Sequence, residues 1–240
     1  MRQSESPHKL QEISKAQWLN LLRREWFQGE HIVVMGPTGS GKTRIVNEIA
    51  DLREYVAVLI IKRKDDSLDL YWDKKYKFIH SWPPEYSFKR VVLHLKPNSM
   101  QDIFKQRAKM QRALTEIYLS GGRCLVVDEA GYMTGVLGLR QELVILLNQG
   151  RSSHLSIICG MTRPSSVIQQ IPREAFSQVR HVLIFRYKDE KDSKAAGAIA
   201  GISARNVIDY MGELRFNTPQ HIGDFLYIGK GTEVYVVRTH

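Results

Sequence analysis

The sequence contains little cysteine, no long apolar run and no secretion signal. Its two cysteines, Cys124 and Cys159, are isolated, so they form neither a disulfide framework nor a zinc-ligand pattern, and we expect buried, reduced thiols. No apolar stretch approaches the roughly 18–20 residues that a membrane-spanning helix needs. Residues 1–7 lack the apolar core of a secretion signal. These absences predict a cytoplasmic protein that does not span a membrane.

Acidic residues are also scarce relative to basic ones. The 25 aspartates and glutamates stand against 35 lysines and arginines, which gives a formal net charge of +10 at pH 7. A basic surplus of this size favours a polyanionic partner, nucleic acid first, although a merely solvated basic surface is the alternative. The 240 residues, 43% of them hydrophobic, suffice for one α/β domain with small appendages.

A glycine-rich segment directly follows the apolar run at residues 31–35. It matches the pattern G-x-x-x-x-G-K-[ST] of phosphate-binding loops, the Walker A motif, and predicts ATP and Mg²⁺ as ligands. Its glycines let consecutive backbone N–H groups face phosphates at a helix N-terminus. In such loops the lysine reaches the β- and γ-phosphates and the following hydroxyl holds Mg²⁺. The predicted nucleotide-binding residues are Gly36, Pro37, Thr38, Gly39, Ser40, Gly41, Lys42 and Thr43.

Four apolar residues, Cys124–Val127, are followed by the carboxylates Asp128 and Glu129, as in a Walker B motif. An acidic residue at the end of a strand beside the phosphate loop positions Mg²⁺, and the next carboxylate orients or deprotonates the attacking water. We therefore predict that Asp128 and Thr43 serve the metal and that Glu129 is the catalytic base. Paired acids at this position are typical of motor-type ATPases rather than of small-molecule kinases.

Apolar runs alternate with helix-compatible segments along the chain, which predicts an α/β fold with a mostly parallel central sheet flanked by helices. Residues 1–30 are expected to form an N-terminal helical extension, with a helix from Lys9 to Phe27, and residues 31–240 a single P-loop domain. Residues 224–238 are expected to contribute C-terminal strands. The expected strands are 32–35, 55–61, 91–95, 123–127, 155–159, 181–185, 225–228 and 234–237, and the expected helices are 44–52, 99–119, 137–147, 195–200 and 204–211.

Two segments are candidates for contact with nucleic acid. In residues 62–90, basic residues such as those at 62–64 alternate with aromatic ones such as Trp72, a composition suited to phosphates and bases. The alternative is an ordinary excursion whose aromatic side chains pack on the core. The second candidate is the loop at residues 132–135, shortly after the Walker B motif.

The stretch after the Walker B motif carries a more distinctive pattern. Gly150-Arg151 at a helix end is followed by an apolar strand that closes on Thr162-Arg163-Pro164-Ser165, and a later strand ends in Phe185-Arg186. Together with the Walker motifs, this pattern resembles the FtsK/HerA superfamily of DNA-translocating P-loop ATPases over residues 31–215. Because the chain has no sign of that family's membrane region, long linker or winged-helix module, it is most similar to the compact viral genome-packaging ATPases.

The resemblance implies roles for three more residues. Arg151 matches the family's Gly-Arg arginine, which looks like an arginine finger acting on the nucleotide of the next subunit. A structural arginine that caps the helix at 137–147 is the alternative, and Arg163 is a second candidate finger. Thr162 stands where the family has a polar sensor, often Gln, and its shorter side chain reaches less far. The candidate catalytic residues are therefore Glu129, Lys42, Arg151, Arg163 and Thr162.

The resemblance also implies a RecA-like core that assembles as a homo-oligomeric ring, a hexamer or pentamer, with ATP between subunits. Its implied partner is double-stranded DNA in a central channel, and a capsid or portal protein is a further partner. The implied location is the host cytoplasm or the virion or procapsid. Two other classes stay open: a conjugative or plasmid DNA-transfer ATPase, and a protein-directed phage assembly or secretion ATPase. A P-loop kinase fits Glu129 and the Gly-Arg segment poorly.

Overall fold

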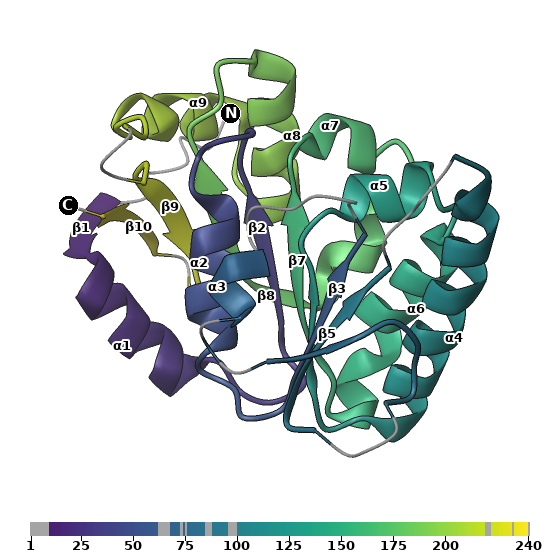
Figure 1. Cartoon of the computed structure of the whole chain (residues 1–240). Coiled ribbons are helices and arrows are strands. Elements are labelled where there is room, and N and C mark those ends of the chain that lie inside the picture. Colours follow the sequence, from purple (N-terminus) through teal and green to yellow (C-terminus); the bar gives the residue numbers. More distant parts are fainter. Residues whose placement is uncertain are drawn as a thin grey trace.

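The computed structural model describes residues 10–61, 68–72, 74, 76–84, 88–95, 100–218, 222–231 and 233–239. Within these residues, ten strands form one sheet in the order β1-β10-β9-β8-β2-β7-β6-β3-β5-β4 (Figure 1). The seven strands from β8 to β4 are mutually parallel, and only β9 runs antiparallel to both of its neighbours. The predicted α/β fold with a mostly parallel sheet is confirmed.

Eight of the described strands fall close to the apolar runs from which they were predicted, whereas β1 and β4 were not predicted as strands. Residues on β2 are fully buried from His31 to Met35, as expected for a central parallel strand covered on both faces. The bounds are β1 Leu10–Ser14, β2 His31–Met35, β3 Val56–Ile60, β4 Lys77–Ile79, β5 Arg90–His94, β6 Cys124–Val127, β7 Ser156–Met161, β8 Val179–Phe185, β9 Phe225–Ile228 and β10 Val234–Arg238.

The helices follow standard capping rules at several ends. Ser203 caps α9 through a bond from the backbone N–H of Asn206, and α8 ends at Gly201, whose φ of 73° is left-handed. The predicted cap of α4 at Ser99 lies outside the described residues. The bounds are α1 Lys15–Glu25, α2 Lys42–Ala50, α3 Leu68–Trp72, α4 Ile103–Ser120, α5 Ala130–Gly135, α6 Arg140–Gln149, α7 Pro164–Val167, α8 Glu190–Ala200 and α9 Ala204–Gly212, with 3-10 turns at Met100–Asp102, Gly150–Ser153 and Arg173–Gln178.

Alternate residues along the strands enter two hydrophobic cores, one on each face of the sheet. Ile32 and Val34 of β2 pack in the core beneath α1, α2 and α3, whereas Val33 and Met35 pack in the core beneath α4, α5, α6, α8 and α9. Figure 1 shows α1 and α2 on one side of the sheet and α4 and α6 on the other. Helices thus cover both faces of the sheet, and the ends of the strands are where a ligand can bind.

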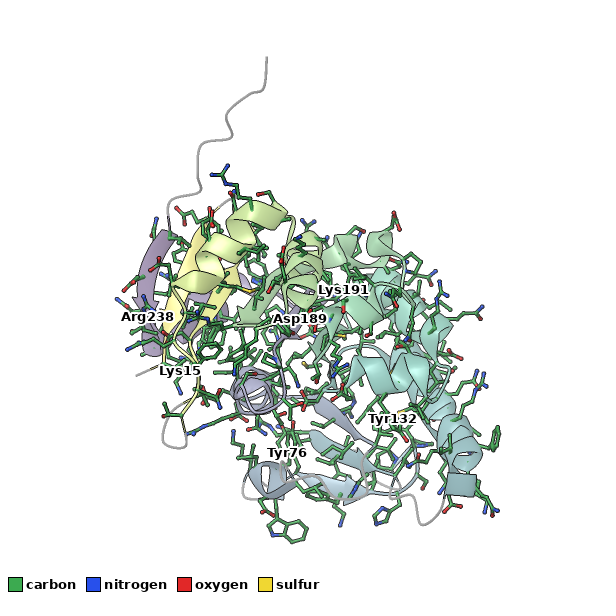
Figure 2. All side chains as sticks on the ribbon, turned by 90° about the horizontal axis from the view of Figure 1, so that it is seen from above. Lys15, Tyr76, Tyr132, Asp189, Lys191 and Arg238 are labelled. Carbon is green, nitrogen blue, oxygen red and sulfur yellow. The ribbon has the colours of Figure 1, made fainter. Side chains whose placement is uncertain are left out.

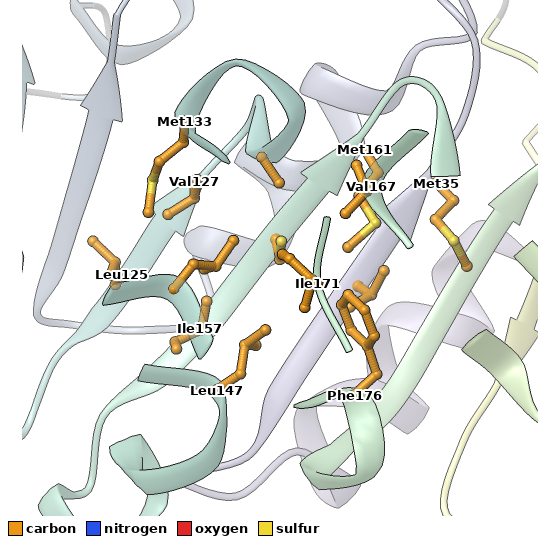
Figure 3. Close-up of a cluster of buried hydrophobic side chains, with 14 of the residues drawn as sticks. Met35, Leu125, Val127, Met133, Leu147, Ile157, Met161, Val167, Ile171 and Phe176 are labelled. Atoms are coloured by element: carbon orange, nitrogen blue, oxygen red, sulfur yellow. The ribbon is translucent and has the colours of Figure 1, made fainter. Parts of the chain in front are cut away.

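The larger core supports the strands on which the functional site stands. Val127 of β6 and Met161 of β7 pack there beside Met133 of α5, Val167 of α7 and Phe176 (Figure 3). All five side chains are at least 96% buried. The ends of β6 and β7 are therefore held in a close-packed interior.

The N-terminal segment differs from its prediction. A single helix from Lys9 to Phe27 was expected, but residues 10–14 form strand β1, which pairs in parallel with β10, and the helix begins only at Lys15. Ser14 forms a capping box with Gln17, which fixes the start of α1. The three-residue spacing of Leu10 and Ile13 fits a helix, but in β1 the two side chains pack on opposite faces of the sheet. The partner strand β10 lies more than 200 residues away in sequence, so the local pattern gave no sign of the pairing.

The basic and aromatic segment 62–90 lies partly outside the described residues, which omit Lys62, Arg63, Lys64, Lys75 and Tyr86. Among the described aromatic residues, three are buried and pack on the core, as the alternative interpretation expected: Tyr71, Tyr76 and Trp82. Among the described basic residues, three form ion pairs with neighbouring acids: Lys74 and Arg90 with Asp51, and Lys89 with Glu54. This part of the segment therefore offers few cations that are not already paired.

Both cysteines lie in the sheet interior as free thiols, Cys124 on β6 and Cys159 on β7. Burial raises the pKa of each thiol to about 12, which keeps both protonated at neutral pH. Among the described helices, none combines the length and the apolarity that crossing a membrane requires.

We predict that Trp18→Ala lowers the free energy of unfolding by about 3–5 kcal/mol, because the fully buried indole packs edge-on against Phe225 with ring centroids 4.9 Å apart. The matched control is Trp72→Ala. Because Trp72 is 70% exposed, this variant is expected to lower the free energy of unfolding by less than about 1 kcal/mol. Urea unfolding followed by circular dichroism measures both changes. Equal losses for the two variants would contradict the packing of α1 on the sheet.

Candidate functional site

Three neighbouring parallel strands bring the predicted motifs to one edge of the sheet. Strand β7 lies between β2 and β6, and all three run in the same direction. The Walker A loop follows β2, the carboxylates Asp128 and Glu129 follow β6, and Thr162 follows β7. In open parallel sheets, ligands bind at the carboxyl ends of the strands. The topology thus places these residues at one site.

The Walker A loop turns sharply between β2 and α2. Gly39 and Gly41 adopt φ values of 81° and 93°, a left-handed region that side chains disfavour. Gly36 is needed for space instead, because a Cβ there would lie 2.6 Å from Oγ of Ser40. Helix α2 begins at Lys42 with no side-chain cap, so its first backbone N–H groups stay available for an anion.

Thr43, Lys42 and Asp128 form the centre of the site. The Thr43 hydroxyl donates a hydrogen bond of 2.6 Å to Oδ2 of Asp128, and Nζ of Lys42 lies 3.6 Å from Oδ1 of the same carboxylate. Oδ1 is buried and finds no hydrogen-bond partner among the residues that the structure describes. A hydroxyl and a carboxylate oxygen side by side, next to a phosphate loop, match the hard oxygen ligands that Mg²⁺ takes. The donor set therefore fits the predicted ion.

Glu129 is the N-cap residue of α5 and directs its carboxylate toward the end of β7. The Thr162 hydroxyl donates a hydrogen bond of 3.3 Å to Oε2 of Glu129. Thr162 thus contacts the predicted base through one carboxylate oxygen. This contact joins the residues that follow strands β6 and β7.

A cavity of ≈ 320 Å³ collects most of the predicted site residues. It also includes Arg44, which the sequence motif does not single out. Four of the predicted residues do not line this cavity: Gly36, Ser40, Arg151 and Arg163. Its lining residues are Pro37, Thr38, Gly39, Gly41, Lys42, Thr43, Arg44, Asp128, Glu129 and Thr162.

Gly160 of β7 is a site residue that sequence reasoning missed. A Cβ at this position would lie 2.4 Å from the backbone oxygen of Asp128 and 2.7 Å from its Oδ1. Only glycine allows β7 to approach the Walker B carboxylate so closely. A lone glycine inside an apolar strand run was the available signal, since such a residue often marks close backbone approach.

Arg151 lies at the opposite edge of the sheet from this cavity, because it precedes β7 whereas Thr162 follows it. It stands in a 3-10 turn that neighbouring segments hold firmly. Gly122 donates to the Ser153 carbonyl, and a Cβ at Gly121 would lie 2.2 Å from that oxygen. Gln28 donates to the His154 carbonyl at 2.6 Å. The Arg151 side chain is exposed and forms no hydrogen bond to α6 among the described residues, which gives no support to the helix-capping alternative.

Arg163, the second candidate, borders an adjoining groove of ≈ 960 Å³ that shares Pro37, Thr38 and Thr162 with the nucleotide cavity. Asp192 in this groove accepts hydrogen bonds from the backbone and hydroxyl of Ser165, which fastens α7 to α8. Figure 2 shows Lys191 and Asp189 on the face seen from above. Four cations line the groove: Arg163, Arg186, Lys188 and Lys191.

The expected DNA-contacting loop at residues 132–135 is not a loop. These residues belong to helix α5, and Met133 and Thr134 are buried. The Thr134 hydroxyl donates to the Ala130 carbonyl within the helix. Packing of Met133 in the core stabilises this helical turn. Tyr132 alone keeps a partly exposed side chain in this segment, on the face seen in Figure 2.

Residues 23–165, more than half of the chain, match the family model described as AAA domain. No curated protein matches the sequence. Several solved structures share the fold at low sequence identity. The genome packaging NTPase B204 from Sulfolobus turreted icosahedral virus 2, in complex with AMPPCP, has a TM-score of 0.58 at 15% identity over 89% of this chain and 99% of that chain.

Two further structures have a similar fold. VirB4 of Thermoanaerobacter pseudethanolicus has a TM-score of 0.63 at 10% identity over 88% of this chain and 89% of that chain. The cytoplasmic domain of the Type VII secretion ATPase EccC from Thermomonospora curvata has a TM-score of 0.53 at 11% identity over 88% of this chain and 25% of that chain. The P-loop ATPase fold that the sequence resemblance implied is thereby confirmed.

We predict that Gly160→Ala lowers the rate of Mg²⁺-dependent ATP hydrolysis about 100-fold, because the new methyl group displaces Asp128 by roughly an ångström. The matched control is Gly212→Ala in α9, where a Cβ would meet no atom within 4 Å. Phosphate release gives the rate, and thermal unfolding shows that both variants fold. An unchanged rate in Gly160→Ala would exclude the close approach of β7 as a requirement of the site.

Proposed function

The chain belongs to the AAA domain family of P-loop ATPases, and from this membership we propose that it is an ATP-driven double-stranded DNA translocase, a subunit of a viral genome-packaging motor. Nucleotide hydrolysis follows from the family, and the coupling to DNA is the further step of the proposal. The observation that carries it is the separation of Arg151 from the cavity of its own chain, because a ring of subunits brings the two together.

Each residue of the cavity has a distinct part in the proposed hydrolysis. Lys42 and the free N–H groups at the start of α2 bind the β- and γ-phosphates. Thr43 and Asp128 hold Mg²⁺, which neutralises phosphate charge when bound. Glu129, oriented by Thr162, accepts a proton from the attacking water. These roles need only side chains that already lie at the carboxyl edge of the sheet.

Arg151 is the proposed finger for a neighbouring subunit. Strand β7 has six residues and spans about 20 Å, so Arg151 at its start is far from the phosphates bound at its end. A guanidinium from an adjacent subunit stabilises charge that develops on the transferred phosphoryl group. The firmly held turn at Gly150–Ser153 suits this role, because an arginine that acts across an interface needs a fixed position.

Three observations support DNA as the polymer. The net charge of +10 favours a polyanion. Four cations line the groove beside the nucleotide cavity. Thr162 lines both the groove and the cavity, so a change at the nucleotide on hydrolysis acts directly on the groove where a phosphate backbone would bind. The genome packaging NTPase B204 is matched over 99% of its chain. We propose double-stranded DNA as the occupant of the groove, with Arg163 as one contact.

A second candidate function is that of a protein-directed assembly or secretion ATPase with the same kind of ring. The specific observation in its favour is the fold similarity to VirB4 and to the Type VII secretion ATPase EccC. In that case ATP hydrolysis acts on a protein, and DNA has no effect on the rate. The two candidates therefore differ in a quantity that a single assay measures.

We predict that long double-stranded DNA stimulates ATP hydrolysis at low salt, and that the stimulation fades between about 50 and 200 mM salt as counterion release weakens binding. The assay compares the purified protein with and without DNA across this range. Glu129→Gln is the control for contaminating hydrolysis, since it retains the P-loop but lacks the base. A hydrolysis rate that is the same with and without DNA at every salt concentration would favour the protein-directed alternative.

We predict that Arg151→Ala and Glu129→Gln are each inactive but regain activity when mixed. At equal ratio, about a quarter of the interfaces in a randomly mixed ring combine an intact base with an intact finger. A mixture of Lys42→Ala with Glu129→Gln is the matched control, because both changes lie on the same side of an interface and no site is complete. Absence of rescue in rings shown to contain both subunits would refute a role for Arg151 across the interface.

A further inference from the structure

The connection between α9 and β9 lies against the Walker A loop. The backbone N–H of Gly223 donates a hydrogen bond of 3.3 Å to the carbonyl of Ser40. The side chain of Ile222 fills the space beside Gly41, where a Cβ would lie 2.5 Å from its Cγ2. Two consecutive residues of this connection thus contact two consecutive residues of the loop.

The bond from Gly223 has a direct consequence for phosphate binding. In a trans peptide the carbonyl of one residue and the N–H of the next point in opposite directions. With the Ser40 carbonyl turned toward Gly223, the N–H of Gly41 points to the other side of the Ser40–Gly41 peptide. Gly41 lines the nucleotide cavity, so this orientation presents its N–H to a phosphate.

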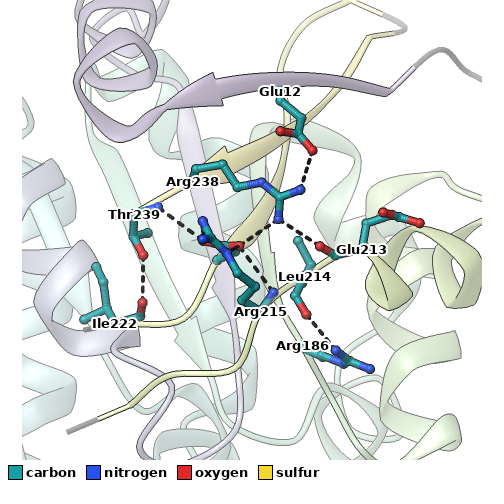
Figure 4. Close-up of polar contacts among 9 residues, drawn as sticks. Glu12, Arg186, Glu213, Leu214, Arg215, Ile222, Arg238 and Thr239 are labelled. Atoms are coloured by element: carbon teal, nitrogen blue, oxygen red, sulfur yellow. Dashed lines mark hydrogen bonds and ion pairs between the residues drawn. The ribbon is translucent and has the colours of Figure 1, made fainter. Parts of the chain in front are cut away.

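A buried carboxylate holds Ile222 and Gly223 in place. Asp224 is fully buried, and its Oδ2 accepts hydrogen bonds of 2.8 Å from Nε of Arg215 and 2.8 Å from Nη1 of Arg238 (Figure 4). The backbone N–H of Thr239 donates to Oδ1, and the Thr239 hydroxyl donates to the Ile222 carbonyl at 2.7 Å. The end of the chain is thereby tied to the residue that packs on the loop.

This cluster joins elements that are distant in sequence. Arg238 also forms an ion pair with Glu12 of β1 and donates to the Glu213 carbonyl after α9. Burial alone would raise the pKa of Asp224, but hydrogen bonds from Arg215 and Arg238 outweigh burial and hold the pKa below its usual range. Asp224 is therefore ionised at neutral pH and serves as a fixed junction between β1, β10 and the connection after α9.

We propose that Asp224 is a positioning residue for nucleotide binding, which acts through Gly223 and Ile222 to fix the Ser40–Gly41 peptide toward the phosphates. The inference rests on nucleotide binding at the Walker A loop and is independent of DNA movement. Asp224 itself touches no nucleotide. It sets the orientation of one backbone donor and the position of the start of α2.

The test compares Asp224→Asn with Thr239→Val, which removes only the hydroxyl that holds the Ile222 carbonyl. We expect the dissociation constant of a fluorescent ATP analogue to rise about tenfold in Asp224→Asn and by a smaller factor in Thr239→Val, as expected for losing one oriented bond to a charged acceptor. The rate at saturating ATP should change far less than KM, because Glu129 and Thr162 are untouched.

Ser203→Ala is the matched control. It removes the α9 cap and lowers stability. Among the described residues no hydrogen bond or ion pair joins Ser203 to the Asp224 cluster or to the loop, so the nucleotide affinity of this variant should equal that of the unmodified protein. Unchanged affinity in both Asp224→Asn and Thr239→Val would overturn the inference while leaving nucleotide binding intact. If Asp224→Asn does not fold, Thr239→Val alone decides. Failure of the unmodified protein to bind the analogue would refute the proposed function and, with it, this inference.

Discussion

The close approach of β7 to the Walker B carboxylate is the constraint on which the rest of the site depends. Because Gly160 has no side chain, the backbone and Oδ1 of Asp128 lie where a Cβ would otherwise be. This brings Asp128 within 2.6 Å of the Thr43 hydroxyl and within 3.6 Å of Lys42, although β7 separates β6 from β2 in the sheet. Thr162, two residues after Gly160, then reaches Glu129. The proposed metal ligands, phosphate ligands and base are thus related through one strand, which has no side chain at Gly160 where it passes Asp128.

The same strand also explains why one subunit is not sufficient for the chemistry proposed for it. β7 carries Thr162 at its end and Arg151 just before its start, so the two predicted catalytic contributions face opposite edges of the sheet. A parallel sheet offers two different edges, and a head-to-tail contact between subunits places one edge against the other. Such heterologous contacts close into rings when the rotation between subunits allows it. The direction of β7 therefore supports the proposed ring, and Arg151 is the residue through which one subunit would act on the nucleotide of the next.

The sequence was sufficient to predict the residues whose role depends on their immediate neighbours. The Walker A loop, the Asp128–Glu129 pair and most of the strands are encoded in short windows, and the structure has them where the patterns indicated. The residues that were missed act over long separations: Gly160 through contact with β6, β1 through pairing with β10, and Asp224 through Arg215 and Arg238. The prediction of a loop at 132–135 was wrong for a related reason, because the packing of Met133 against distant core residues stabilises a helix there.

The two C-terminal strands and β1 extend the sheet beyond what the Walker motifs need. These three strands position the residues of a polar cluster. Asp224 at the start of β9, Arg238 at the end of β10 and Glu12 on β1 meet in one cluster, and that cluster ends at Gly223 and Ile222 against the phosphate loop. A glycine-rich loop is flexible, since each glycine admits many backbone conformations. The conformation of the loop must therefore be fixed by residues outside the motif. In this protein those residues lie on or next to strands β1, β9 and β10.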